Sequence, residues 1–300
     1  MAFPTLPSAP RLTLEDARRQ RTRGEFWESS RGRLHVVVRG PEKSEHLPLL
    51  LLHGYSDNAS TWRRLQRHLE REFRTIAIDM PGHGLSDTPE NTALTMGDLA
   101  ALVRECMAAH EIPRAFVVAS SLGGGTALGL GAKYAARVTG MLLLGSVGVP
   151  FLPPAAFAPL FLPRVEGIAT LVASLPGLRR TLLARIAFPN GHPVSDQDVG
   201  GYFDPWTIEG RVHYFKRLGR KLDLGEPVPW LSQIQVPVTI VDCGRDHLVP
   251  SHVSKELVKR IPGAIRVELP TAGHLPQIDS TEEVGRLVRF ALARSERETF

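Results

Sequence analysis

Three polar residues spread along the 300-residue chain are of the types needed for nucleophilic catalysis. Ser121 carries a hydroxyl, Asp246 a carboxylate and His274 an imidazole, and they follow one another in that order. A serine hydroxyl becomes a nucleophile when a histidine removes its proton and a carboxylate orients that histidine. We therefore predict that these three side chains form a catalytic triad.

The residues around Ser121 strengthen this prediction. An apolar run through Ala119 leads into a glycine-rich stretch from Gly123, the pattern of a strand, a sharp turn and a helix. Small residues at these two positions let strand and helix approach closely. The usual G-x-S-x-G pattern of such turns carries glycine where this chain has Ala119. The helix start directs unpaired backbone N–H groups toward the reacting oxygen. Taken alone, the segment also fits Ser120 and Ser121 merely capping a helix.

Asp246 and His274 each lie in a loop directly after a predicted strand. The carboxyl ends of the strands form the edge at which open α/β sheets bind their ligands. Asp242 is an alternative acid, but we expect it inside its strand, where it reaches His274 less well. His247 is an alternative base, but it neighbours the predicted acid and is expected to face solvent or to cap the following helix.

A fourth segment could stabilise negative charge on a reacting oxygen. His53 and Gly54 end an apolar run, and a glycine there allows a tight turn that points a backbone N–H into the cleft. We predict that the N–H groups of Tyr55 and Leu122 form an oxyanion hole. The alternative is that His53 and Gly54 simply end a strand.

The rest of the sequence alternates between strand-like and helix-like segments. Short apolar runs predict strands buried on both faces, at 47–52, 75–78, 115–119, 141–144, 236–241 and 265–269. Segments of helical period lie between them, including Thr95–His110, a helix capped by Ser60, and the segments 253–261 and 282–292. This alternation predicts an α/β fold with a mainly parallel twisted sheet, and a hairpin at 24–39 adds an antiparallel edge.

One long segment interrupts the alternation. Residues 149–228 contain no strand-like run and are too apolar to remain solvated, which predicts an inserted helical cap. The core then comprises 24–148 and 229–296, and residues 1–23 form an N-terminal extension. The cap carries apolar residues that either contact substrate or pack against the core, namely Phe157, Leu160, Phe161, Ile168 and Leu171.

The composition indicates which classes of partner and which cellular location to expect. The net charge is +5, but most basic residues are scattered in pairs, so we predict no nucleic-acid partner. No apolar stretch reaches the length of a membrane span, and the proline-broken start does not match a signal peptide. Two cysteines, Cys106 and Cys243, cannot build a disulfide framework or a zinc site alone. We expect a soluble cytoplasmic protein that needs no cofactor or metal; its oligomeric state is left open.

Taken together, the motifs resemble the α/β-hydrolase superfamily from Arg33 to Leu292. The matching segments are His53-Gly54, Asp79-Met-Pro-Gly-His-Gly-Leu-Ser86, Ser120-Ser-Leu-Gly-Gly124, Gly244-Arg-Asp-His-Leu-Val-Pro250 and Gly273-His274. The resemblance implies a lid over the nucleophile. It also implies that residues 79–86 form a structural loop, so that His83 is not the base.

Several reactions fit such a triad. Ser121 lies at the sharp turn between strand and helix, where epoxide hydrolases and haloalkane dehalogenases carry aspartate. A serine there disfavours an alkyl-enzyme intermediate and favours acyl transfer to water. We predict hydrolysis of a carboxylic ester with a hydrophobic acyl or aryl group. Thioester, lactone or diketone-acid hydrolysis is the alternative, with Arg211, Lys216 or Arg217 binding a substrate carboxylate. A small-molecule receptor with little turnover is an alternative of another class.

Overall fold

The computed structural model describes residues 12–20, 24–89, 94–152, 175–187, 191 and 193–298. Within these ranges eight strands form one sheet in the order β1-β2-β4-β3-β5-β6-β7-β8. The strands are β1 (Glu25–Trp27), β2 (Leu34–Arg39), β3 (Leu49–Leu52), β4 (Thr75–Ile78), β5 (Ala115–Ser120), β6 (Val138–Leu144), β7 (Val238–Cys243) and β8 (Ile265–Leu269). β1 and β2 pair in antiparallel fashion, β2 pairs antiparallel with β4, and the remaining pairs are parallel. The predicted parallel sheet with an antiparallel edge is confirmed.

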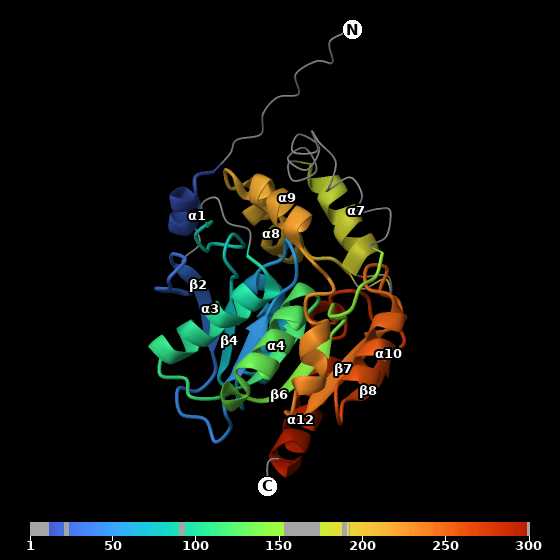
Figure 1. Cartoon of the computed structure of the whole chain (residues 1–300). Helices are drawn as coiled ribbons and strands as arrows, with labels where there is room; N and C mark the ends of the chain where they lie inside the picture. Colours follow the sequence, from blue (N-terminus) through green and yellow to red (C-terminus); the bar gives the residue numbers. More distant parts are fainter. Residues whose placement is uncertain are drawn as a thin grey trace.

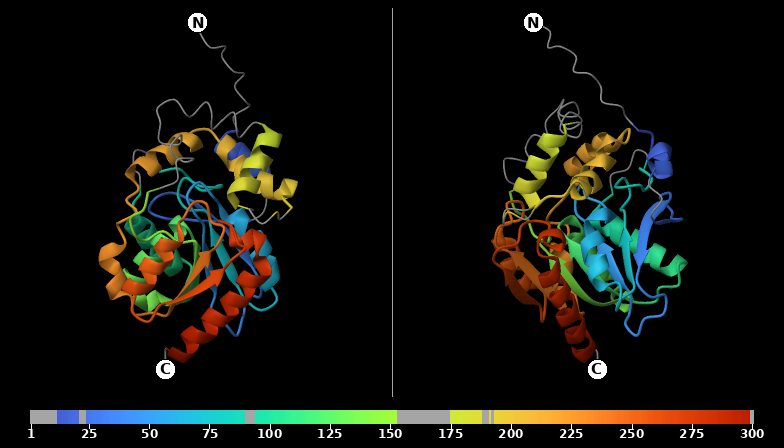
Figure 2. Two further views of the ribbon diagram at one scale, coloured as in Figure 1. Left: turned by 90° about the vertical axis from the view of Figure 1, so that its right-hand side faces the viewer. Right: turned by 180° about the vertical axis from the view of Figure 1, so that it is seen from behind.

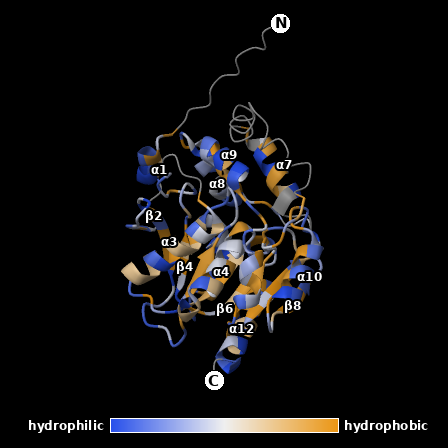
Figure 3. Cartoon of the chain, in the orientation of Figure 1, coloured by the Kyte–Doolittle hydropathy of each residue, from blue (hydrophilic) through white to orange (hydrophobic). Residues whose placement is uncertain are grey.

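The central strands are buried on both faces because helices cover both sides of the sheet. Along β3, Leu50 and Leu52 belong to one apolar cluster and Leu49 and Leu51 to another, as the alternation of side chains requires. Hydrophobic residues accordingly concentrate on the strands in the middle of the molecule, which are orange in Figure 3.

Helices on opposite faces of the sheet supply these two clusters (Figure 2). The first face is covered by α3 (Met96–Ala109), α4 (Leu122–Lys133) and α10 (Ser251–Arg260), and the second by α2 (Arg63–Leu69) and α12 (Thr281–Glu298). Short helical segments lie in the connections between strands and longer helices, namely η1 (Ala59–Trp62), η2 (Ala135–Arg137), η5 (Val228–Gln233) and α11 (Pro276–Asp279). None of the described helices is both long and apolar enough to cross a membrane.

Two predicted helix starts had different outcomes. α3 begins as expected, because the Thr95 side chain accepts from Asp98 N–H and the Asp98 carboxylate accepts from Thr95 N–H. The prediction that Ser60 caps the following helix is wrong. Asn58 is the cap residue, and its side chain accepts the Ser60 N–H at 3.0 Å. Ser and Asn are comparable caps, so sequence alone placed the helix start two residues late.

The segment between β6 and β7 is helical in its described part, which fits the predicted insertion. It contains α7 (Pro176–Ala187), α8 (Asp196–Phe203), η4 (Asp204–Thr207) and α9 (Arg211–Lys221), which together we call the cap. These helices lie above the end of the sheet opposite to the C-terminus (Figure 1). α1 (Leu14–Gln20), in the N-terminal extension, lies at the same end. The apolar residues predicted between Phe157 and Leu171 lie outside the described residues.

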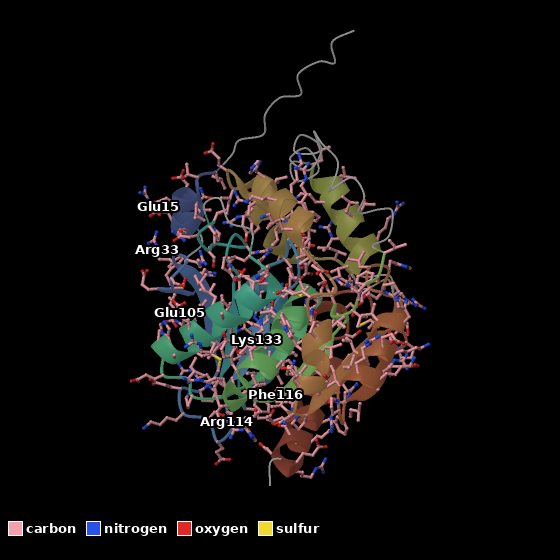
Figure 4. The ribbon with its side chains drawn as sticks, viewed as in Figure 1. Glu15, Arg33, Glu105, Arg114, Phe116 and Lys133 are labelled. Atoms are coloured by element: carbon pink, nitrogen blue, oxygen red, sulfur yellow. The ribbon has the colours of Figure 1, made fainter. Side chains whose placement is uncertain are left out.

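Charged side chains are distributed rather than gathered by sign on at least one side of the molecule. Glu15, Arg33 and Glu105 follow one another along the side formed by α1, β2 and α3 (Figure 4). Acidic and basic side chains therefore lie on the same side of the molecule.

Candidate active site

Ser121 lies on a strained turn between β5 and α4. Its backbone is in a left-handed region, with φ 53° and ψ −118°, and its N–H donates to Leu144 O at 3.1 Å. A β-carbon at Gly123 would stand 2.3 Å from Leu52 O, so only glycine lets α4 approach β3 this closely. A strained non-glycine residue persists where its surroundings enforce it, as at functional sites. The turn thus has the geometry that the sequence predicted.

Asp246 and His274 contact each other directly. Asp246 Oδ2 lies 2.8 Å from His274 Nδ1, and the two side chains are 1% and 10% exposed. The second carboxylate oxygen accepts the N–H groups of Leu248 at 2.7 Å and Val249 at 3.0 Å. An ionised carboxylate only accepts, so Nδ1 carries the proton and Nε2 keeps a lone pair. The imidazole is therefore oriented to act as a base through Nε2.

The charge around His274 tunes its basicity. Burial alone would lower the pKa of His274, but the charge of Asp246, its hydrogen bond and the charge of Asp57 together raise it above the ordinary value. Asp57 is itself buried, and burial raises the pKa of this carboxyl to about 7 despite hydrogen bonds from Asn58 N–H and the Thr61 hydroxyl. Asp57 was not identified from the sequence, because no motif distinguishes it from other loop carboxylates.

The end of β6 places the three predicted residues around one peptide. Ser121 N–H binds Leu144 O, and a β-carbon on the next residue, Gly145, would stand 2.8 Å from Asp246 Oδ2 and 3.7 Å from His274 Nδ1. Counted over the whole residue, Ser121 and His274 are each 8% exposed. The hydrogen bonds of the described residues do not include one from the Ser121 hydroxyl to His274. Such bonds are often long before substrate binds, so the complete triad stays a prediction.

The predicted oxyanion donors belong to two segments that meet at Ser121. Leu122 is the first residue of α4, where a backbone N–H has no acceptor within its helix. Tyr55 follows Gly54, and a β-carbon at Gly54 would be 3.0 Å from Ser121 Cβ and 3.5 Å from its Oγ. The turn after β3 therefore runs directly past Ser121, which is compatible with the predicted oxyanion hole.

The alternative acid and base are engaged elsewhere or face solvent. Asp242 Oδ2 accepts from Arg266 Nε at 3.0 Å and from the Ser251 hydroxyl, so it pairs with β8 rather than with His274. His247 is exposed. His83 is buried with Nδ1 against Pro81 O at 3.0 Å, and burial holds its pKa well below the ordinary value. The preference for Asp246 and His274 agrees with these contacts.

A buried carboxylate organises the loop at 79–86. Asp79 accepts from Ala59 N–H at 2.6 Å and Leu85 N–H at 2.8 Å and lies 2.7 Å from His35 Nδ1. Burial by itself raises the pKa of Asp79, but these hydrogen bonds and the charges of His35 and His53 outweigh it and lower that pKa. The carboxylate links β2, η1 and the loop, which is the structural role that the resemblance implied.

The basic residues of α9 were predicted to bind a substrate carboxylate, and for Arg211 this is wrong. Arg211 is fully buried and donates to Gly84 O and Ser86 O, both at 3.1 Å, and to the Thr88 hydroxyl at 3.2 Å. Arg217 donates to Pro89 O at 2.7 Å. Carbonyl oxygens of the adjacent loop thus occupy these donors. Sequence could not reveal this, because the acceptors are backbone atoms more than 120 residues away.

Groups of three or more His, Cys, Asp or Glu placed to hold a metal are absent from the ranges that the structure describes. At this edge of the sheet the structure brings a hydroxyl, an imidazole and a carboxylate to the end of β6, next to the two backbone N–H groups predicted from the sequence. These are the components of acyl transfer through a serine nucleophile.

Comparison with known proteins relates the chain to hydrolases. It is 26% identical over 255 residues to a pyrrolizixenacetamide deacetylase from Xenorhabdus hominickii, covering 81% of this chain and 90% of the relative. It is 37% identical over 123 residues to a serine hydrolase-like protein from Danio rerio; the match covers 41% of this chain and only 36% of that protein.

Solved structures and family models show the same fold. A meta-cleavage product hydrolase from Pseudomonas fluorescens IP01 superposes with a TM-score of 0.75 at 24% identity, covering 91% of this chain and 98% of that one. The family model described as the alpha/beta hydrolase fold matches residues 48–281, which include every predicted site residue. The chain belongs to the alpha/beta hydrolase family.

Proposed function

We propose that this protein is a serine hydrolase that cleaves a carboxylic ester through an acyl-enzyme intermediate. The observation that carries the proposal is the buried Asp246–His274 hydrogen bond beside the strained turn of Ser121. Membership of a hydrolase family and the relationship to a deacetylase support it. The small-molecule substrate is proposed to bind between the cap and the carboxyl ends of the strands.

In the proposed first half-reaction His274 Nε2 accepts the Ser121 proton while Oγ bonds to the carbonyl carbon. The Asp246 carboxylate stabilises the imidazolium that forms, and the N–H groups of Tyr55 and Leu122 bind the oxyanion. The carbon–oxygen bond to the leaving alcohol then breaks, and His274 returns the proton to that alcohol. In the second half-reaction His274 removes a proton from water, whose oxygen bonds to the acyl carbon. The bond from that carbon to Ser121 Oγ then breaks, His274 returns the proton to Oγ, and the carboxylic acid leaves.

The described part of the cap supports an apolar acyl or aryl group. Tyr55, beside the nucleophile, packs against Phe215 with ring centroids 6.0 Å apart. Trp206 packs against both Phe203 and Phe215, at 5.5 and 5.6 Å. Aromatic surface next to a few polar groups is typical of pockets for hydrophobic ligands.

The competing reactions make distinct demands on the site. A diketone acid, the substrate class of a carbon–carbon hydrolase, carries a carboxylate that requires a cationic partner. Arg211 is fully buried and bonded to carbonyl groups of the adjacent loop, and besides Asp246 the charge that acts on the pKa of His274 is that of the acidic Asp57. These features favour an uncharged substrate. Thioester and lactone hydrolysis use the same groups and stay alternatives to be separated by assay.

The test is hydrolysis of p-nitrophenyl esters of graded acyl length, alongside thioesters, lactones and diketone acids. We expect the esters to be the best substrates and Ser121→Ala to lower kcat by about 10⁴-fold or more. Ser120→Ala is a matched control, because Ser120 is adjacent and buried and its hydroxyl has no partner among the described residues. Ligand binding without turnover by the wild type would favour a receptor, and equal activity of Ser121→Ala would exclude the proposed nucleophile.

A further inference from the structure

The cap contacts the turn that carries one of the proposed oxyanion donors. We call residues 54–58 the oxyanion loop. The Tyr55 hydroxyl donates to Phe215 O of α9 at 2.6 Å, and Trp206 Nε1 of η4 donates to Ser56 O at 3.0 Å. Asn58 Nδ2 donates to Gly201 O of α8 at 2.9 Å. Three consecutive elements of the cap therefore bind this one loop.

The loop has a backbone conformation that needs such support. Ser56 has φ 56°, in the left-handed region that residues other than glycine rarely adopt. Its carbonyl is the acceptor for Trp206, so the bond from the cap acts on the strained residue itself. The Tyr55 N–H, proposed to bind the oxyanion, precedes this residue directly. A small rotation at Ser56 would move that N–H relative to Ser121.

Among the described residues, side-chain hydrogen bonds within the core involve the two ends of the loop, whereas those of Tyr55 and of the Ser56 carbonyl involve the cap. Before the loop, His53 Nε2 accepts the Met80 N–H at 3.0 Å. At its second end, Asp57 accepts from Thr61 Oγ1 at 3.2 Å, and Asn58 Oδ1 accepts the Ser60 N–H at 3.0 Å. The side-chain bond to the Ser56 carbonyl comes from the cap. The position of the central peptides thus depends on how the cap is docked.

We propose that Trp206 and the Tyr55 hydroxyl are positioning residues through which docking of the cap sets the oxyanion hole. This inference rests on the proposed serine hydrolase function. An oxyanion donor acts on the charge that develops in the transition state and contributes little to ground-state binding. Loss of the cap contact therefore lowers kcat and leaves KM nearly unchanged. A cap that served only to bind substrate would have the opposite effect.

The test compares Trp206→Phe, which keeps an aromatic ring and removes the N–H donor, with the wild type. We expect kcat for a short p-nitrophenyl ester to fall about 10- to 100-fold, as small displacements of catalytic groups do, with KM within about twofold. The dissociation constant of an alkyl boronic acid, whose tetrahedral adduct places an oxygen in the oxyanion hole, should rise by a similar factor. Tyr55→Phe is a second, independent variant with the same expected signature.

Thr207→Val is the matched control. The Thr207 hydroxyl donates to Asp204 O within η4, so this variant removes a hydrogen bond of the cap that does not reach the oxyanion loop. Its kcat should stay within about twofold of the wild type. Wild-type kcat in both Trp206→Phe and Tyr55→Phe, or a fall in kcat with unchanged boronic acid binding, would overturn the inference. Failure of the wild type to hydrolyse esters or bind boronic acid would instead overturn the proposed function.

Discussion

The catalytic edge of the core and the cap are built on different kinds of contact. At the core edge, the carboxylate of Asp246 is fixed by backbone N–H groups two and three residues further along the chain. In the cap, the contacts of Arg211 and Trp206 join side chains to carbonyl groups 125 to 150 residues away. The predicted site residues thus lie at strand ends and are held in part by short-range bonds, whereas long-range side-chain bonds connect the cap to the core.

This difference separates two kinds of defect. A change at the core edge removes a reacting or orienting group while the surrounding strands still fold. A change in the cap contacts leaves every reacting group in place and alters stability or alignment. The comparison therefore predicts the largest losses of kcat from core-edge variants, and smaller losses of kcat or losses of stability from cap variants.

The largest effect is expected from Asp246→Asn. An amide keeps the size of the side chain but stabilises the wrong histidine tautomer and no longer stabilises the imidazolium, which costs serine proteases about 10⁴-fold in kcat. We expect a loss of that order for this protein, measured by steady-state hydrolysis of a p-nitrophenyl ester.

Asp242→Asn is the matched control, because it makes the same change four residues earlier on the acid that pairs with Arg266. It should destabilise the fold but leave kcat of the folded protein within a fewfold of the wild type. A large kcat loss in Asp242→Asn with little effect in Asp246→Asn would reverse the assignment of the acid.

The contrast between core and cap also explains what could be predicted from sequence. The strands, the helix at 95–110 and the Asp246–His274 pair were predictable, because apolar period and short motifs encode local structure. The residue that caps the N-terminus of η1, Asn58, was missed because Ser60 is an equally good candidate nearby.

Long-range contacts left no signal in the sequence. The bonds of Arg211 to carbonyl groups and of Trp206 to Ser56 O could not be predicted, because a backbone acceptor is the same at every residue. The proximity of Asp57 to His274 likewise depends on two loops meeting, which no spacing in the sequence reveals.

A moderate effect on stability is expected from Arg211→Met. The change removes the donors for Gly84 O and Ser86 O and leaves buried carbonyl groups unsatisfied, at a cost of about 1–3 kcal/mol each before compensation by the apolar side chain. We expect the free energy of unfolding to fall by about 2 kcal/mol in urea denaturation.

Arg220→Met is the control for this variant, because it makes the same substitution on the same helix at an exposed position. Its free energy of unfolding should stay within about 0.5 kcal/mol of the wild type. Equal stabilities of the two variants would mean that the bonds from Arg211 do not stabilise the docked cap.

The smallest effect is expected in the pH dependence of activity. It tests whether Asp57 of the oxyanion loop raises the pKa of His274. His274 must be neutral to accept the Ser121 proton, so kcat/KM should rise with pH through the pKa of His274 in the free enzyme. Because Asp246 and Asp57 raise that pKa, the midpoint should lie above the ordinary value of about 6.5. Asp57→Asn removes one negative charge and should move the midpoint to lower pH, whereas Asp196→Asn, at a side chain 99% exposed, should not. A midpoint that stays in place in Asp57→Asn would show that this carboxyl is neutral when His274 titrates, as its raised pKa of about 7 allows. A midpoint that rises would contradict the effect of Asp57 on His274.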